Sequence, residues 1–187
     1  MKTILNETSL PGVVMVKIEY PHDDRGFFME PWNKKVFAEA GIDTDFVQEG
    51  HSGSTRGVLR GLHYQDMKAP MAKLVRCVVG QVLDVVVDIR VGSPTFGQHF
   101  NITLSAEEKN LIYIPIGFAH GFLVISNYAE VLYKMSNYWT PEAEGGIAWD
   151  DVDLGIDWGI ESPILSEKDT KLPSFADYQT NPAFKFQ

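Results

Sequence analysis

Residues 60–65 read Arg60-Gly61-Leu62-His63-Tyr64-Gln65, and residues 114–122 read Ile114-Pro115-Ile116-Gly117-Phe118-Ala119-His120-Gly121-Phe122. Each stretch places one histidine among apolar and aromatic residues, beside a segment with the composition of a β-strand. Glycine and proline near each histidine are typical of turns. The two stretches predict one pocket that is lined from the inside of a β-barrel, and the functional residues are expected there.

Most of the remaining chain also has the pattern of short strands separated by turns. Gly80, Gly92, Pro94 and Gly97 mark the turns. Residues 32–40 are expected to form a helix that Gly41 terminates. Many short strands at regular spacing predict a mainly β protein, a double-sheet jelly roll or barrel with a few short helices. The segments rich in β-branched and apolar residues are 13–20, 58–64, 72–79, 81–90, 98–104, 111–114, 121–126 and 130–135.

The length of 187 residues suits one domain with a sizeable core. We expect residues 1–187 to form a single domain with an N-terminal strand and helix region. After Pro141 the pattern loosens, and Trp149, Trp158 and the pair Ile164-Leu165 are expected to anchor a tail that wraps the barrel.

Composition argues against several classes of partner. The net charge of −9 disfavours binding to nucleic acid, because a phosphate backbone needs a basic face. No run approaches the roughly 18 apolar residues of a membrane span, and residues 1–7 lack the apolar stretch of a signal peptide. The single cysteine, Cys77, lies in an apolar run and is expected to be a buried structural thiol. These features predict a soluble cytoplasmic protein.

His63, Arg60 and Lys73 are the first candidates for chemistry. If strands 58–64 and 72–79 form a hairpin, His63 and Lys73 face the same interior. Free histidine titrates at about pH 6.5, which suits proton abstraction at neutral pH, and a nearby ammonium stabilises an oxyanion. The alternative is a core histidine with a satisfied hydrogen bond. Three such groups in one predicted hairpin favour the functional interpretation.

His120 fits the second half of the cupin pattern, in which proline and glycine make a turn that directs a histidine inward. The first half of that pattern supplies His-x-His and a glutamate in metal-binding cupins, whereas this chain has His63-Tyr64-Gln65. Two histidines fall short of the three protein ligands usual for catalytic zinc. A cupin-like fold with no metal in its pocket is therefore predicted.

Three other features admit both a functional and a structural interpretation. Tyr133 can donate a proton across a pocket from His63, or be a core tyrosine bonded to the backbone. The segment Asp24-Arg25-Gly26-Phe27-Phe28-Met29-Glu30 can stack on a base and pair with phosphate, or be a surface turn. The segment Leu165-Ser166-Glu167-Lys168-Asp169 is a charged cluster that, taken alone, is a solvated turn.

The chain resembles the dTDP-4-dehydrorhamnose 3,5-epimerase family over nearly its whole length. The resemblance rests on ordered blocks: Asp24-Arg25-Gly26-Phe27-Phe28-x-Glu30, Phe46-Val47-Gln48, 57–65, Lys73-Leu74-Val75-Arg76, Asp84-Val85-x-Val87-Asp88-x-Arg90, 114–122, Tyr133-Lys134, Gly146-Ile147-x-Trp149-Asp150-Asp151, Leu154-x-Ile156-x-Trp158 and Leu165-Ser166-x-Lys168-Asp169.

The resemblance implies a homodimeric, cupin-like double-stranded β-helix (jelly roll) that needs neither a metal nor an organic cofactor. It implies that His63 is the general base, supported by Asp169, that Tyr133 is the proton donor and that Lys73 stabilises the enolate. The implied substrate is dTDP-4-dehydro-6-deoxy-D-glucose, epimerised at C3 and C5 on the way to rhamnose for polysaccharides such as O-antigen. The substrate contacts that it implies are Arg25, Phe27, Glu30, Gln48, Arg60, His120, Glu144 and Lys168.

Two departures from the family pattern leave alternatives open. The chain has Glu49-Gly50 where family members commonly have Asp-Asn, and Trp139 where a second tyrosine is frequent. Either change could select a relative that acts at one carbon only, C3 or C5, or on a GDP- or CDP-linked keto sugar. A non-catalytic cupin that binds a sugar nucleotide or stores a metal is the third alternative.

Overall fold

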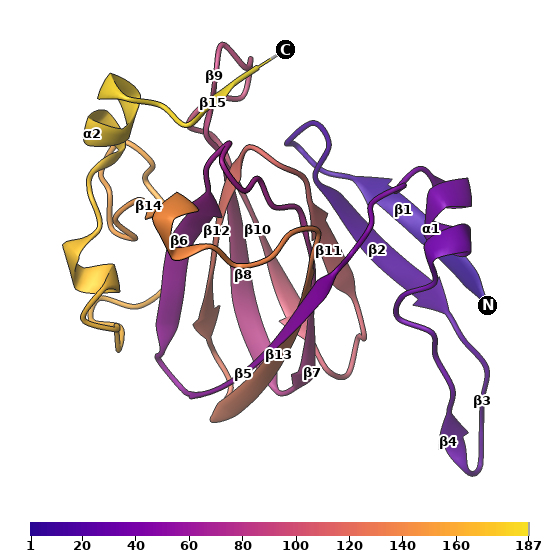
Figure 1. Cartoon of the computed structure of the whole chain (residues 1–187). Helices are drawn as coiled ribbons and strands as arrows, with labels where there is room; N and C mark the ends of the chain where they lie inside the picture. The colour runs from indigo at the N-terminus through magenta and orange to yellow at the C-terminus, as the bar shows by residue number, and fades with distance from the viewer. Residues whose placement is uncertain (187) are drawn as a thin grey trace.

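The computed structural model describes residues 1–186 as two facing β-sheets with helices and loops around them (Figure 1). No helix in this part of the chain combines the length and the apolar character needed to cross a membrane. The helices are α1 (Lys34–Ala40) and α2 (Phe175–Thr180), with the 3-10 turns η1 (Pro141–Ala143) and η2 (Asp169–Lys171). The strands are β1 (Lys2–Glu7), β2 (Val14–Glu19), β3 (His22–Asp23), β4 (Gly26–Phe27), β5 (Gln48–Thr55), β6 (Leu59–Gln65), β7 (Lys73–Val79), β8 (Gln81–Asp88), β9 (Arg90–Val91), β10 (His99–Ser105), β11 (Leu111–Ile114), β12 (Phe118–Val124), β13 (Tyr128–Met135), β14 (Glu144–Gly146) and β15 (Phe184–Lys185).

Two antiparallel sheets make up the barrel. The larger has the strand order β1-β2-β11-β7-β13-β5, and the smaller has the order β10-β8-β12-β6-β14. Chain neighbours β7 and β8 belong to different sheets, as do β10 and β11, so the chain alternates between the two layers. This arrangement confirms the predicted mainly β, cupin-like jelly roll.

The apolar faces of the two sheets meet in the interior. One cluster of buried residues joins Val75 of β7 and Val131 of β13 to Val86 of β8 and Phe122 of β12. Cys77 belongs to this cluster as a free, buried thiol, as expected, and burial raises its pKa. The alternation of side chains along each strand therefore fills one end of the space between the sheets with a dry core.

The predicted hairpin of residues 58–64 and 72–79 is wrong. Strand β6 pairs with β12 and β14, whereas β7 pairs with β11 and β13 in the other sheet. The chain crosses between the layers after β6 instead of turning back beside it. His63 and Lys73 consequently approach the interior from opposite sides, which a hairpin would not allow.

The predicted helix is present as α1, two residues shorter at its start than expected. The Asn33 side chain accepts a hydrogen bond from the Val36 N–H at 3.3 Å, so it caps the first turn. Gly41 ends the helix in a left-handed conformation with φ of 110°. Phe37 is fully buried and packs, with Leu74 and Leu111, on the outer face of the larger sheet.

The segment after β14 covers the outer face of the smaller sheet, where α2 lies in Figure 1. Trp158, Phe175 and Tyr178 are buried against Leu59 and Val85 of that sheet. Trp149 also packs there, partly buried. The expected anchor Ile164 is instead 57% exposed, and it is held through its backbone, which donates to the carbonyl oxygen of Gly57 at 2.8 Å.

Candidate active site

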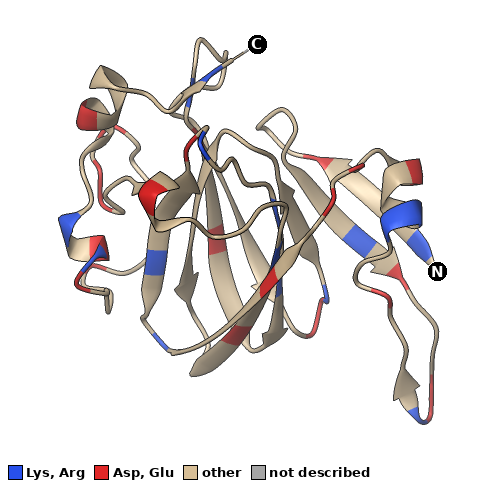
Figure 2. Cartoon of the chain, viewed as in Figure 1, with Lys and Arg blue, Asp and Glu red and all other residues tan. Residues whose placement is uncertain are grey.

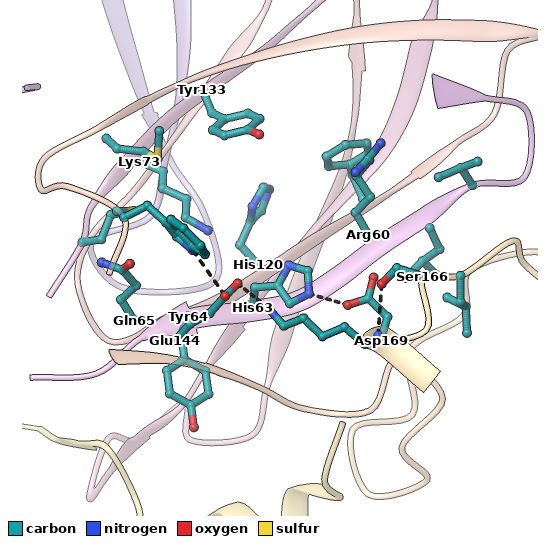
Figure 3. A pocket seen from close by; sticks show the side chains of 18 of the residues that line it. Arg60, His63, Tyr64, Gln65, Lys73, His120, Tyr133, Glu144, Ser166 and Asp169 are labelled. Carbon is teal, nitrogen blue, oxygen red and sulfur yellow. Dashed lines mark hydrogen bonds and ion pairs between the residues drawn. The ribbon is translucent and has the colours of Figure 1, made fainter. Parts of the chain in front are cut away.

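One end of the space between the sheets is an open cavity of about 460 Å³ rather than packed core (Figure 3). Strands of both sheets line it, and the loop around residues 164–169 closes one side. Eight of the twelve residues predicted for the site line this cavity: Arg60, His63, Lys73, His120, Tyr133, Glu144, Lys168 and Asp169. The two histidine stretches therefore do contribute to one pocket, as predicted.

The two histidines lie on neighbouring strands. His63 of β6 and His120 of β12 are direct cross-strand partners. Beside them Gly61 faces Gly121, and a Cβ atom on Gly61 would lie 2.5 Å from the Cα of Gly121. Glycine at this position lets the two backbones approach closely enough to place both rings on one wall.

His63 is paired with a buried carboxylate. Its Nε2 lies 2.6 Å from Oδ1 of Asp169, which is 4% exposed, in η2 (Figure 3). Burial acts to raise the pKa of Asp169, but the hydrogen bond from His63, the charge of that ring and the nearby Lys168 outweigh it and lower this pKa below its ordinary value. Asp169 is therefore an anion, and Nε2 of His63 is its donor. The lone pair of the neutral ring is then on Nδ1.

Tyr133 and Lys73 occupy the opposite wall. Tyr133 lies on β13 and Lys73 on β7, adjacent strands of the larger sheet, and both side chains reach into the cavity in Figure 3. Burial lowers the pKa of Lys73 to about 8, while the charges of Asp84 and Glu144 oppose that shift. The cavity therefore holds an ammonium that loses its proton close to physiological pH.

Ion pairs and hydrogen bonds organise the rim. Nζ of Lys168 lies 2.5 Å from Oε1 of Glu144, and the indole N–H of Trp139 donates to Oε2 of the same carboxylate at 3.3 Å. Glu144 on β14 thus links the loop before η1 to the C-terminal segment. Arg60 on β6 donates two hydrogen bonds to the Ser54 hydroxyl, at 3.0 and 3.1 Å.

The charge of the cavity differs from that of the whole chain. Acidic residues outnumber basic ones 25 to 16 over the molecule, and both kinds are spread over many elements of the fold in Figure 2. The cavity instead combines Arg60, Lys73 and Lys168 with only Glu144 and Asp169. A small anionic ligand can therefore bind an acidic protein at this place.

The other four predicted site residues lie outside the cavity lining. Arg25, Phe27 and Glu30 belong to the segment around the β3–β4 hairpin, which projects away from the barrel in Figure 1. Phe27 is 56% exposed, and among residues 1–186 the ion-pair partner of Arg25 is its neighbour Asp23. Gln48 lies at the start of β5, and its side-chain oxygen accepts from the Trp139 N–H at 2.9 Å.

Sequence reasoning missed two polar residues of this region. Gln65 is two residues after His63 and therefore shares its side of the strand, a signal that was available. Its amide donates to the Ala69 carbonyl oxygen at 2.7 Å and its oxygen accepts from Thr140 N–H at 2.7 Å, which fixes the loop before η1. Asp84 hydrogen-bonds to His120, and its signal was an acid in the middle of an apolar strand.

Among residues 1–186 no three His, Cys, Asp or Glu side chains are grouped so that they could hold a metal ion. The polar groups of the cavity instead form acid–base pairs. A jelly roll with an imidazole–carboxylate pair on one wall of its cavity and a phenol with an ammonium on the other defines a cupin-like enzyme equipped for proton transfer.

Comparison with known proteins specifies the family. The chain belongs to the dTDP-4-dehydrorhamnose 3,5-epimerase family, whose model matches residues 7–177, and it is therefore an isomerase. It is 53% identical to the dTDP-4-dehydrorhamnose 3,5-epimerase of Pseudomonas aeruginosa over 90% of this chain and 94% of the relative. It is 51% identical to the enzyme of that name from Shigella flexneri over 91% of this chain and 95% of the relative.

Solved structures agree with this assignment. The crystal structure of dTDP-6-deoxy-D-glucose-3,5-epimerase from Legionella pneumophila in complex with dTDP-4-keto-L-rhamnose is 40% identical, with a TM-score of 0.94 and coverage of 99% of both chains. A 3'-monoepimerase from Streptomyces bikiniensis in complex with dTDP-quinovose is 33% identical, with a TM-score of 0.89 and coverage of 95% of this chain and 91% of the other.

Proposed function

We propose that this protein converts dTDP-4-dehydro-6-deoxy-D-glucose to dTDP-4-dehydro-L-rhamnose by inverting C3 and C5. One observation carries the proposal: His63 and Tyr133 come from different sheets and line the same cavity. Inversion of a carbon needs a base on one face of the sugar and an acid on the other. The names of the relatives and the keto-rhamnose complex of the Legionella enzyme support this substrate.

Proton removal is assigned to His63. The 4-keto group acidifies the hydrogens on C3 and C5, and Nδ1 of His63 takes either one as a proton. The C–H electron pair then becomes an enolate whose negative charge lies on the C4 oxygen. Asp169 supports the imidazolium that forms, and the Lys73 ammonium stabilises the enolate oxygen.

Proton return is assigned to Tyr133. Its hydroxyl protonates the same carbon from the opposite face, so the enolate becomes a ketone again and the phenol becomes a phenolate. His63 is then an imidazolium and Tyr133 an anion. Exchange of protons with water restores both groups before the second carbon reacts.

The diphosphate and the sugar bind to the remaining polar residues of the cavity. Arg60 and Lys168 supply positive charge for phosphate, and His120 and Glu144 are placed to contact the sugar. Gln48 lies outside the cavity lining and holds the backbone of Trp139, which lines the cavity, and by its match to the family pattern it is assigned to the nucleotide end. Binding energy from this remote end fixes the ring between base and acid.

We infer that the active form is a homodimer. Arg25, Phe27 and Glu30 match family positions that contact the nucleotide, yet their hairpin projects away from the cavity of its own chain. Phe27 and Phe28 are 56% and 65% exposed, which is costly for a free hairpin. A second subunit would cover these rings, and light scattering on the purified protein tests this.

We also propose a single domain for residues 1–187 and a cytoplasmic location. A buried free thiol at Cys77 is typical of proteins from reducing compartments. The product supplies rhamnose to a cell-surface polysaccharide such as O-antigen, with no nucleic acid or membrane partner. Deletion of the gene would then remove rhamnose from that polysaccharide.

Epimerisation at a single carbon is the second candidate. Two observations support this candidate. The structure is similar to that of a 3'-monoepimerase, and Gly50 lies directly beside Tyr133. The two candidates differ in the number of carbons at which hydrogen exchanges with solvent.

Incubation with dTDP-4-dehydro-6-deoxy-D-glucose in D2O, followed by NMR, tests both candidates. Deuterium at C3 and C5 with formation of the L-sugar supports the main proposal, and deuterium at one carbon supports the second. The reaction should proceed in EDTA, because only side chains of the protein take part. Absence of exchange overturns both, and GDP- and CDP-linked keto sugars and dTDP binding alone are then compared.

A further inference from the structure

Asp84 is a buried carboxylate that the steps above do not use. It lies in the middle of β8 with no exposed surface, opposite Phe122 of β12 and Ile102 of β10. A charged group in such surroundings destabilises the fold unless it is paired, and an apolar side chain of similar size packs there without that cost. A carboxylate at this position therefore calls for a reason other than stability.

Of the two oxygens of this carboxylate, one has a hydrogen-bond partner among residues 1–186. Oδ2 of Asp84 accepts a hydrogen bond from Nε2 of His120 at 2.8 Å, and His120 is itself 7% exposed. Oδ1 is buried and has no hydrogen-bond partner among residues 1–186. The carboxylate thus fixes the ring of His120 and retains an uncompensated lone pair beside the cavity.

Lys73 is the cation that this negative charge affects. Lys73 approaches the cavity from β7 in the larger sheet, while Asp84 and His120 come from β8 and β12 in the smaller one. Burial lowers the pKa of Lys73, and two negative charges oppose that shift, Asp84 with the larger effect and Glu144 with the smaller one. The other titratable or charged side chains that face this cavity are Arg60 and His63 of β6, His120 of β12, Tyr133 of β13, and Lys168 and Asp169 of the C-terminal segment. Tyr64 of β6 directs its ring to the other side of the strand, against Tyr178 and Phe184.

We propose that Asp84 is a positioning residue of the epimerase: its carboxylate holds the His120 ring against the substrate and supplies the negative charge that balances the Lys73 ammonium across the cavity. This inference rests on the proposed function, because the ammonium matters only where an enolate forms. It gives each histidine of one wall its own carboxylate, Asp169 for His63 and Asp84 for His120, and Asp84 also balances Lys73 on the opposite wall.

Asp84→Asn tests the role of the charge. Asparagine has the same shape and can still hydrogen-bond to His120, but it carries no charge. We expect kcat to fall about tenfold to 100-fold, by analogy with the loss on removing a carboxylate that orients a metal-binding histidine. The alkaline limb of the kcat/KM profile should also move to lower pH, because Lys73 loses the charge that keeps it protonated, and the Kd for dTDP should stay within about twofold.

Asp88→Asn is the matched control. Asp88 is equally buried on the same strand, but its carboxylate bonds to Arg90, Ser93 and Thr95, whereas that of Asp84 bonds to His120 of the cavity. This variant should have a lower Tm and an alkaline limb at the wild-type pH. A purely structural role for Asp84 predicts the same behaviour for both variants, and that result would overturn the inference.

A double-mutant cycle of Tm values tests the inference independently of catalysis. Lys73→Met and Asp84→Asn each leave one buried charge without its counterpart, whereas the double variant removes both. The loss of Tm in the double variant should be smaller than the sum of the two single losses. A double variant that folds when Asp84→Asn does not would also support the inference. Additive losses, or a double variant that fails to fold, contradict it.

These measurements distinguish a failure of the proposed function from a failure of the role proposed for Asp84. Wild-type protein that exchanges no deuterium in D2O contradicts the proposed function, while the Tm cycle still reports on the charge balance. Wild-type turnover with an unchanged Asp84→Asn profile contradicts the role of Asp84 alone.

Discussion

The Nε2 atom of His63 lies 2.6 Å from Oδ1 of Asp169, although 106 positions separate the two residues in the chain. The C-terminal segment makes this contact possible, because it crosses the outside of the smaller sheet and returns η2 to the mouth of the cavity. A loop that looks like a solvated turn in the sequence therefore completes an imidazole–carboxylate pair. The pair fixes which ring nitrogen of His63 carries its proton.

Asp169→Asn should lower kcat far more than it changes KM. The amide no longer fixes the tautomer of His63 or stabilises the imidazolium, and a loss of about 100-fold or more is expected by analogy with other His–Asp pairs. Steady-state kinetics on the nucleotide sugar check this. Thr170→Ala alters the same 3-10 turn on an exposed side and should keep wild-type kcat; an Asp169→Asn variant with full activity would contradict the assignment.

The same pair should contribute to stability in a pH-dependent way. The pKa of Asp169 is lower in the folded protein than its ordinary value of 3.8, so its contribution is present above pH 3.8 and is lost as the pH falls through the folded-state pKa. Urea unfolding at pH 7 and below pH 4 should show a smaller acid loss in Asp169→Asn than in wild type. Asp23→Asn, at an exposed ion pair, should match wild type; an equal acid loss in all three proteins would argue against a stabilising pair.

Activity should decline on the alkaline side. Burial lowers the pKa of Lys73 to about 8, so the ammonium that stabilises the enolate disappears as the pH rises through that value. We expect kcat/KM to fall above about pH 8. Lys73→Met should lose roughly 100-fold to 1,000-fold in kcat and should lack this alkaline limb, since no titrating ammonium remains. A limb that persists in Lys73→Met would have to come from another group.

Gly50 should control the position of the Tyr133 ring, which carries the proton donor. A Cβ atom at Gly50 would lie 2.3 Å from Cε2 of Tyr133, its partner across strands β5 and β13, so Gly50→Ala must displace that ring. We expect a lower kcat, an altered ratio of exchange at C3 and C5, and unchanged dTDP binding. Gly53→Ala displaces Tyr128 in the same way on the same strand but outside the cavity lining. Equal effects of the two variants would remove the special role of Gly50.

The sequence predicted the sheet residues and the pocket better than it predicted how strands pair. Segments rich in β-branched and apolar residues identified β6, β7, β8 and β13, and the continuous apolar run of β8 corresponds to a strand that is buried on both faces. Strand β5 was not predicted, since its polar sequence Gln48–Thr55 lacks such a pattern and is held by β13. Local patterns also could not reveal that β6 and β7 belong to different sheets, because pairing depends on contacts distant in sequence.

The site could be predicted only where a residue carries its own chemical signal. His63, Lys73 and Tyr133 were identifiable as reactive groups in apolar segments, and Asp169 entered only through resemblance. The position of Arg25 could not be judged, because a projecting hairpin and a pocket wall have the same turn sequence. Asp84 was overlooked since its partner His120 lies 36 residues away.

Tyr133→Phe in D2O tests most directly whether base and acid act from opposite walls. Phenylalanine keeps the ring but has no proton to return, whereas His63 can still remove a proton and give back deuterium on its own face. We predict that NMR shows deuterium entering the dTDP-4-dehydro-6-deoxy-D-glucose with little inversion, while wild type shows exchange with inversion and His63→Ala shows neither. Inversion by Tyr133→Phe at the wild-type rate would contradict the central assignment.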